Sequence, residues 1–255
     1  MTHSREIYTP GYSQPTLRLM LMRTAAKHAA FFTPFLRPGM RLLECGCGPG
    51  TITIDLANLV APGQVVGIDL EPVQLRSALD RGRQRQINVS FGVASIYGLP
   101  FSDGSFDAVF AHALFEHLRE PVRALLEMRR VLRSSGLIGV RSPDWAGWLV
   151  HPPNPLIEQA FQQFKKIQIT NGGNPHVGRT LCQFRLKIPH CTGRKFPTPN
   201  LHRRASLASD GVEPSAVFWR VLGVTESEAK EQAAASAPSC PRGGTRPALR
   251  RSFSR

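Results

Sequence analysis

Strand-like and helix-like segments alternate between residues 41 and 141, and this alternation restricts the fold more than any other feature. Short apolar runs rich in β-branched residues predict strands at residues 41–45, 64–70, 88–93, 106–111 and 136–141. Helical periodicity predicts one N-terminal helix through residues 17–25 and further helices after the first, second and fourth of these strands. The helix after the first strand is predicted at about 51–60. The helix after the fourth strand is predicted to place Val122, Leu125, Leu126 and Leu132 on one face. The pattern indicates an α/β fold, a doubly wound and mostly parallel sheet with helices on both faces, in which ligands bind beyond the carboxyl ends of the strands.

A glycine-rich turn follows the first predicted strand. It contains Glu44 and then glycines at 46, 48 and 50, and alternate glycines permit positive φ angles and close approach of the backbone to a ligand. A dinucleotide fingerprint requires glycine at position 51, where the chain has Thr51. Because the Glu44 carboxylate would also repel a pyrophosphate, the turn suits a cationic ligand better than a nicotinamide dinucleotide. A nicotinamide-dependent oxidoreductase is therefore the weaker alternative.

The second predicted strand ends in Asp69, nineteen residues after Gly50. A carboxylate at this position can accept hydrogen bonds from both hydroxyls of a ribose, and such charge-assisted bonds are strong. The alternative is that Asp69 caps the helix that begins near Pro72. The glycine turn at the expected distance upstream favours the ribose interpretation.

Five blocks of sequence in the same order resemble the class I S-adenosylmethionine-dependent methyltransferases (methyltransferase type 11), especially the branch that includes quinone-biosynthesis methyltransferases. The blocks are LLECGCGPG (42–50), VVGIDL (65–70), ASIYGLPFSDGSFDAVFAH (94–112), FEHLREP (115–121) and EMRRVLRSSGLIGVRSPDW (127–145). The resemblance extends over residues 12–180. It implies a Rossmann-like fold, S-adenosyl-L-methionine as the cofactor, and methyl transfer to a small-molecule acceptor by in-line displacement at the sulfonium methyl.

The resemblance also implies roles for individual residues. Glu44 would orient the methionine ammonium above the glycine loop, Asp69 would bind the ribose, and Leu70 would pack on the adenine ring. Ser95 stands where the family usually has an acidic or small residue, so adenine recognition would depend on a hydroxyl and on backbone. The implied cofactor-binding set is Glu44, Gly46, Gly48, Gly50, Asp69, Leu70, Ser95, Ile96 and Ala111.

The chemistry requires few catalytic side chains. A sulfonium methyl is a strong electrophile, so the protein mainly aligns the acceptor and excludes water, and a base is needed only when the acceptor must lose a proton. His112 and His117 are both candidate bases, and His112, nearest the expected methyl position, is the preferred base or substrate contact. His117 is a second candidate substrate residue, or else serves the turn before the helix at Pro121. Trp145, together with Trp148, either forms an aromatic wall for an apolar acceptor or covers the sheet edge. The predicted helix at 155–167 is a candidate lid.

Three parts of the chain differ in composition. Residues 1–40 predict an N-terminal helical cap and residues 41–180 the cofactor-binding domain, whereas residues 181–255 carry 13 basic and 5 acidic residues among scattered prolines and serines. In this tail only residues 216–224 resemble an element that could be buried. The helix and antiparallel strand pair that normally complete the family's sheet are not recognisable, so we expect an incomplete sheet and a disordered or aberrant tail, such as the product of a shifted reading frame or an alternative splice.

Charge, hydrophobicity and cysteine content limit the partners and the cellular location that we expect. The net charge of +14 raises the alternative of an RNA-directed methyltransferase, but most of the excess lies in the tail, so a nucleic-acid partner is not expected. A catalytically impaired cofactor-binding relative is another alternative. No apolar run approaches the ~20 residues of a membrane span and no secretory signal is visible, so a cytoplasmic protein is expected. Five cysteines without paired spacing predict reduced thiols and no metal site.

Overall fold

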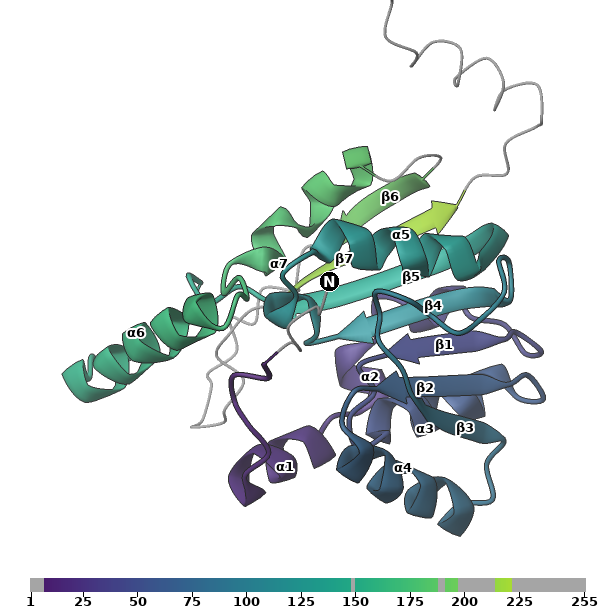
Figure 1. The fold of residues 1–255 in the computed structure, drawn as a ribbon, viewed down its shortest axis with the longest axis horizontal. Coiled ribbons are helices and arrows are strands. Elements are labelled where there is room, and N and C mark those ends of the chain that lie inside the picture. The colour runs from purple at the N-terminus through teal and green to yellow at the C-terminus, as the bar shows by residue number, and fades with distance from the viewer. Residues whose placement is uncertain (1–6, 148–149, 188–190, 197–213, 222–255) are drawn as a thin grey trace, which may run out of the picture. The chain divides into compact units, whose positions relative to one another are not determined.

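The computed structural model describes residues 7–147, 150–187, 191–196 and 214–221. A seven-stranded sheet in the order β3-β2-β1-β4-β5-β7-β6 lies at its centre, with helices on both faces (Figure 1). The strands are β1 Leu42–Cys45, β2 Val65–Asp69, β3 Val89–Val93, β4 Phe106–His112, β5 Leu132–Pro143, β6 Cys191–Phe196 and β7 Pro214–Val221. The α-helices are α1 Gln14–Leu21, α2 Ala25–His28, α3 Thr51–Val60, α4 Pro72–Gln84, α5 Pro121–Val131, α6 Pro155–Thr170 and α7 Val177–Thr180. Short 3₁₀ helices are η1 Thr33–Phe35, η2 Phe115–His117 and η3 Leu181–Lys187.

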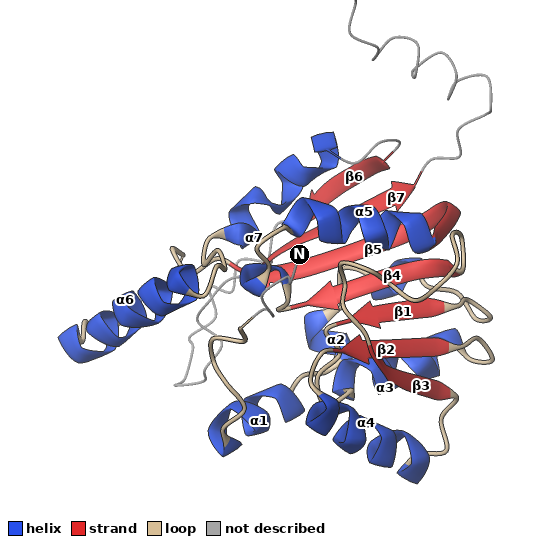
Figure 2. Cartoon of the chain, in the orientation of Figure 1, coloured by secondary structure: helices blue, strands red, loops and turns tan. Residues whose placement is uncertain are grey.

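The first five strands are parallel, which confirms the predicted doubly wound α/β fold (Figure 2). Successive side chains of a strand point to opposite faces. Leu42 packs with α2 and α3 on one face, and Leu43 packs with α5 on the other. The chain runs outward from β1 to β3 and then returns to β4 on the other side of β1. This reversal places a crevice beyond the carboxyl ends of β1 and β4, where doubly wound sheets bind ligands.

Two predicted helices differ from those observed. The N-terminal periodicity predicted one helix through residues 17–25, but the structure has α1 and α2, separated where Thr24 adopts an extended conformation and caps α2 by accepting from the Lys27 N–H. In α5 the prediction placed Leu126 and Leu132 on the buried face. The buried face of α5 is formed by Ala124, Leu125, Met128 and Val131, which leaves Leu126 44% exposed. Leu132 lies beyond the end of α5 and is the first residue of β5.

The sheet does not end at β5, so the expectation of an incomplete sheet was wrong. β7 pairs antiparallel with β5 from Leu137↔Arg220 to Pro143↔Pro214, and β6 pairs antiparallel with β7. Strands pair through main-chain hydrogen bonds, which do not require the apolar alternation used to predict strands. β7 overlaps the apolar stretch noted at 216–224. The remainder of the predicted tail, residues 197–213 and 222–255, lies outside the described residues.

Helix α6 begins at the Asn154 cap, whose side chain accepts from two backbone N–H groups of the first turn. Trp145, after β5, packs its ring against Phe161 and Phe164 of α6, with ring centroids 5.7 and 4.9 Å apart. Within the described ranges, no helix combines the length and apolar character needed to cross a membrane.

Candidate functional site

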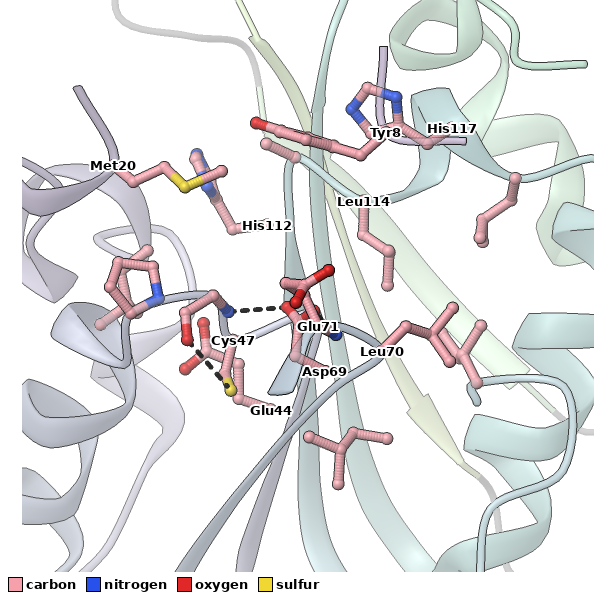
Figure 3. A pocket seen from close by; sticks show the side chains of 18 of the residues that line it. Tyr8, Met20, Glu44, Cys47, Asp69, Leu70, Glu71, His112, Leu114 and His117 are labelled. Carbon is pink, nitrogen blue, oxygen red and sulfur yellow. Dashed lines mark hydrogen bonds between the residues drawn. The ribbon is translucent and has the colours of Figure 1, made fainter. Parts of the chain in front are cut away.

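A cavity of about 380 Å³ lies beyond the carboxyl ends of β1, β2 and β4 (Figure 3). Its volume is in the range of sites that hold small molecules and cofactors. All the predicted site residues line it except Gly50, Ala111 and Trp145. The topology therefore brings the separate sequence motifs to one place.

The glycine turn forms the floor of the cavity. Gly46, Gly48 and Gly50 all have positive φ angles, of 72°, 51° and 75°, a conformation that side chains disfavour. Gly46 and Gly48 line the cavity, but Gly50 does not. A Cβ atom added at Gly50 would lie 2.7 Å from the Ala78 Cβ and 2.8 Å from the Phe91 ring. Gly50 thus lets the start of α3 approach α4 and β3, and its position favours a packing role over the predicted ligand contact.

Asp69 connects the end of β2 to the glycine turn. Its Oδ2 accepts from the Gly48 N–H and its Oδ1 from the Glu71 N–H, both at 2.9 Å. Burial raises the pKa of Asp69, while these N–H donors lower it. The N-cap of α4 is Glu71, whose own side chain accepts from the Val73 N–H. Each Asp69 oxygen keeps a further lone pair for a ligand hydroxyl, so the ribose interpretation fits the geometry.

Glu44 is a buried carboxylate on the cavity wall, only 2% exposed. The Thr53 hydroxyl donates to its Oε2 at 2.6 Å. Burial raises the pKa of Glu44 to about 8, although the Thr53 hydrogen bond and the positive charge of Arg23 lower it. A ligand ammonium beside Glu44 would stabilise the ionised carboxylate that burial disfavours.

The side of the cavity beyond β2 and β3 is less polar. Leu70 is 36% exposed and Ile96 is buried, and the Ser95 hydroxyl accepts from the Tyr97 N–H at 3.2 Å. All three predicted residues line the cavity and suit a planar base. Ala111, in contrast, is fully buried in the core between β1 and β5, and the cavity is lined by the next two residues, His112 and Ala113. Side-chain alternation along β4 explains this one-residue error.

His112 and His117 lie at the opposite end of the cavity from Glu44 and Cys47 (Figure 3). The edge of the His112 ring contacts His28, with centroids 4.9 Å apart. Burial, together with the positive charges of Arg23 and Arg141 and the neighbouring His28 ring, holds the pKa of His112 well below its usual range. Burial lowers the pKa of His117 to about 4, with a smaller contribution from Arg23.

The N-terminal segment forms a roof that the sequence analysis missed. Tyr8, Tyr12, Met20 and Arg23 all line the cavity. The Tyr8 ring stacks on Tyr12 at 5.2 Å, and burial raises the pKa of Tyr8 to about 12. Met20 was predicted only as part of an N-terminal helix, and Tyr8, Tyr12 and Arg23 share no periodic pattern, so no local signal placed these residues at a ligand site. The predicted lid, the helix at 155–167, contributes no cavity residue.

Trp145 also lies away from the cavity, packed on α6. The position of Trp145 favours the alternative in which its ring covers the edge of the sheet. Trp148, considered with it as a second aromatic residue, lies outside the described residues.

The residues present fit S-adenosylmethionine. The cavity presents the buried Glu44 carboxylate for an ammonium, Asp69 for ribose hydroxyls, and an apolar shelf at Leu70 and Ile96 for an adenine. The glycine turn leaves space where a Cβ would project. No group of metal-binding side chains occurs among the residues for which the structure gives positions.

Comparisons with known proteins agree with this fit. Residues 43–140 match the family model described as a methyltransferase domain. An uncharacterized methyltransferase of Schizosaccharomyces pombe is 31% identical over 206 residues, covering 78% of this chain and 72% of that protein. The ubiquinone/menaquinone biosynthesis C-methyltransferase UbiE of Bdellovibrio bacteriovorus is 31% identical over 104 residues, which cover 41% of this chain and 44% of UbiE.

Among solved structures, the YcgJ protein of Bacillus subtilis superimposes with a TM-score of 0.57 at 15% identity, covering 83% of this chain and all of YcgJ. At this identity the likeness concerns the fold alone. The fold, the cavity and the sequence relatives lead to the same assignment. The chain belongs to the class I S-adenosylmethionine-dependent methyltransferase family.

Proposed function

We propose that this methyltransferase modifies a small, largely apolar or planar molecule. The observation that carries the proposal is the aromatic roof at the acceptor end of the cavity, where the Tyr8 ring packs on His117 and stacks on Tyr12. A cavity of about 380 Å³ suits a small molecule better than a nucleic-acid or protein chain.

The bound cofactor supplies a methyl group on a positively charged sulfur. Glu44 would hold its ammonium and Asp69 its ribose, which fixes the direction in which the methyl points. Tyr8, Leu114 and Leu118 line the acceptor side and would exclude water from it. His112 would contact the acceptor beside the methyl group.

The relative named for ubiquinone and menaquinone biosynthesis supports a small acceptor. An RNA acceptor is the second candidate, because the net charge is +14. Phosphate contacts would make RNA affinity fall steeply as salt rises. The proposal predicts no such dependence for methyl transfer.

The test is methyl transfer by the purified full chain with S-adenosylmethionine. The acceptors are a panel of phenols, hydroxyquinones and catechols, with transfer RNA and a basic peptide as polymer arms. S-adenosylhomocysteine and methylated product are quantified by mass spectrometry. Transfer to at least one small acceptor and to neither polymer is expected, and transfer confined to RNA or peptide would overturn the proposal. Calorimetric titration with S-adenosylhomocysteine and with NAD checks the cofactor separately, and only the first should bind.

A further inference from the structure

Glu116 and His117 form a buried pair of neighbouring ionisable side chains, on η2 directly after β4. Glu116 is 3% exposed and His117 is 7% exposed. The His117 Nε2 lies 3.8 Å from the Glu116 Oε1. The distance is longer than a hydrogen bond, as is common for catalytic pairs before the substrate binds.

Three other parts of the chain hold Glu116 in place. The Ser142 hydroxyl of β5 donates to its Oε2 at 2.9 Å. The Gln168 side chain of α6 and the Asn174 N–H both donate to its backbone carbonyl, at 3.0 and 2.9 Å. Burying a carboxylate costs free energy unless it is paired. This carboxylate is fixed so that its free oxygen faces the His117 ring.

The other side of the His117 ring belongs to the cavity. His117 lines it, and the Tyr8 ring packs at its edge with centroids 4.8 Å apart. The His117 Nδ1 is buried and has no hydrogen-bond partner among the described residues. A buried ring nitrogen without a partner needs one from a ligand. The groups that act on the imidazole are Glu116, the Tyr8 ring and the Arg23 charge.

His112 lacks this arrangement. It contacts His28, and the charged groups near it are the positive Arg23 and Arg141. The Arg23 charge opposes a proton on either histidine, but Arg141 adds to this repulsion only at His112, whereas His117 has the Glu116 carboxyl group 3.8 Å away. Of the two histidines, His117 has the surroundings of a base.

We propose that His117 removes the proton of an acceptor hydroxyl, that Glu116 is its positioning residue, and that the acceptor is a phenol or enol. The inference rests on the proposed small-molecule methyl transfer and adds the acceptor atom. The acceptor oxygen bonds to the methyl carbon while its proton passes to the His117 Nδ1. The sulfur–methyl bond breaks and its electron pair remains on sulfur as a neutral thioether. The positive charge thus moves from sulfur to the imidazolium, next to Glu116, and the product is a methyl ether.

The test compares His117→Asn and Glu116→Gln with a matched control, His176→Asn. His176 lies 3.6 Å from Asp144 in a similar pair away from the cavity. Single-turnover rates are measured for phenols of graded acidity at pH about 7. His117→Asn is expected to slow weakly acidic phenols by about 10²–10⁴-fold, and to change little for phenols that are already ionised in solution. Glu116→Gln should lower kcat more than it changes KM, with the same dependence on acidity.

A second measurement does not require turnover. 4-Nitrophenol, whose anion absorbs visible light, is titrated into the complex with S-adenosylhomocysteine at a pH below the phenol's pKa. Wild type and His176→Asn should bind it as the anion, and His117→Asn as the neutral phenol. Equal spectra for wild type and His117→Asn, or rate losses independent of phenol acidity, would overturn the assignment of His117.

Methyl transfer to carbon acceptors alone would also overturn the assignment of His117 but would leave the proposed function standing. Transfer to no small molecule would refute the proposed function itself. Calorimetry and thermal unfolding verify that each variant folds and binds the cofactor product.

Discussion

Gly50 provides a direct test of the way the glycine turn is packed. In Gly50→Ala, the new Cβ would occupy a left-handed conformation with φ of 75° and lie within 3 Å of both Ala78 and Phe91. The left-handed conformation costs about 1–2 kcal/mol, and overpacking between α3, α4 and β3 costs about 1–3 kcal/mol. Together these effects predict a loss of about 2–5 kcal/mol in the free energy of unfolding.

The assay is thermal unfolding of the full chain, supported by urea denaturation. For a domain of this size each kcal/mol corresponds to about 2–4 °C, so the Tm of Gly50→Ala should fall by roughly 4–20 °C. The matched control is Gly98→Ala, because an added Cβ at Gly98 meets nothing within 4 Å and its φ is not left-handed. The control should change stability by less than about 0.5 kcal/mol.

The same pair of variants separates packing from ligand contact. Because Gly50 does not line the cavity, folded Gly50→Ala should bind S-adenosylhomocysteine within a few-fold of wild type, measured well below its Tm. Equal stability of Gly50→Ala and Gly98→Ala would refute the packing argument. An unchanged Tm with abolished binding would assign Gly50 to the ligand instead.

Two carboxylates and the aromatic roof of the cavity give three further predictions. Asp69→Asn should weaken S-adenosylhomocysteine binding roughly 10–100-fold in calorimetry, because charge-assisted acceptors are lost; an equal loss in Glu71→Gln would contradict the ribose role. Burial raises the pKa of Glu44 to about 8, so the folded state retains a proton there that the unfolded state releases near its ordinary pKa. The stability of the ligand-free wild type relative to Glu44→Gln should therefore fall by about 2–4 kcal/mol between pH about 5 and about 8 in urea unfolding, and a constant difference would contradict the buried charge. Tyr8→Ala should speed release of S-adenosylhomocysteine about tenfold in stopped-flow measurements, since about 1–2 kcal/mol of apolar burial is lost; an unchanged release rate would show that Tyr8 does not cover the ligand.

The fold and the cofactor half of the cavity could be predicted from sequence because local patterns determine them. The run at 51–60 predicted α3 with its observed bounds, and β1 and β2 shifted by only one residue at each affected end. The carboxyl ends of parallel strands meet at one edge of a sheet, so Glu44 and Asp69 were expected together before any contact was known. Gly50 and Ala111 do not line the cavity, because their positions face the packed interior, and the residue pattern did not specify this.

The acceptor half depends on contacts between distant segments. Tyr8 meets His117, Ser142 meets Glu116, and Gln168 meets the carbonyl of Glu116. None of these pairs produces a periodicity, a cap or a turn, so the sequence contained no local signal for them. The apolar stretch at 216–224 marked the position of β7, but its pairing with β5 is a contact between distant segments that the pattern did not specify.

This division explains why the cofactor of this chain was predicted more easily than its acceptor. The motifs around Glu44 and Asp69 are those from which we expect contacts to the adenosyl and methionine groups, and they contain no information about what lies on the other side of the methyl. The acceptor side combines an N-terminal roof with the Glu116–His117 pair, whose anchors come from β5 and α6. A change in any of these segments would alter the acceptor side and leave the cofactor motifs intact. The experiments on His117 and Tyr8 therefore bear on acceptor choice, whereas those on Asp69 and Glu44 bear on the cofactor.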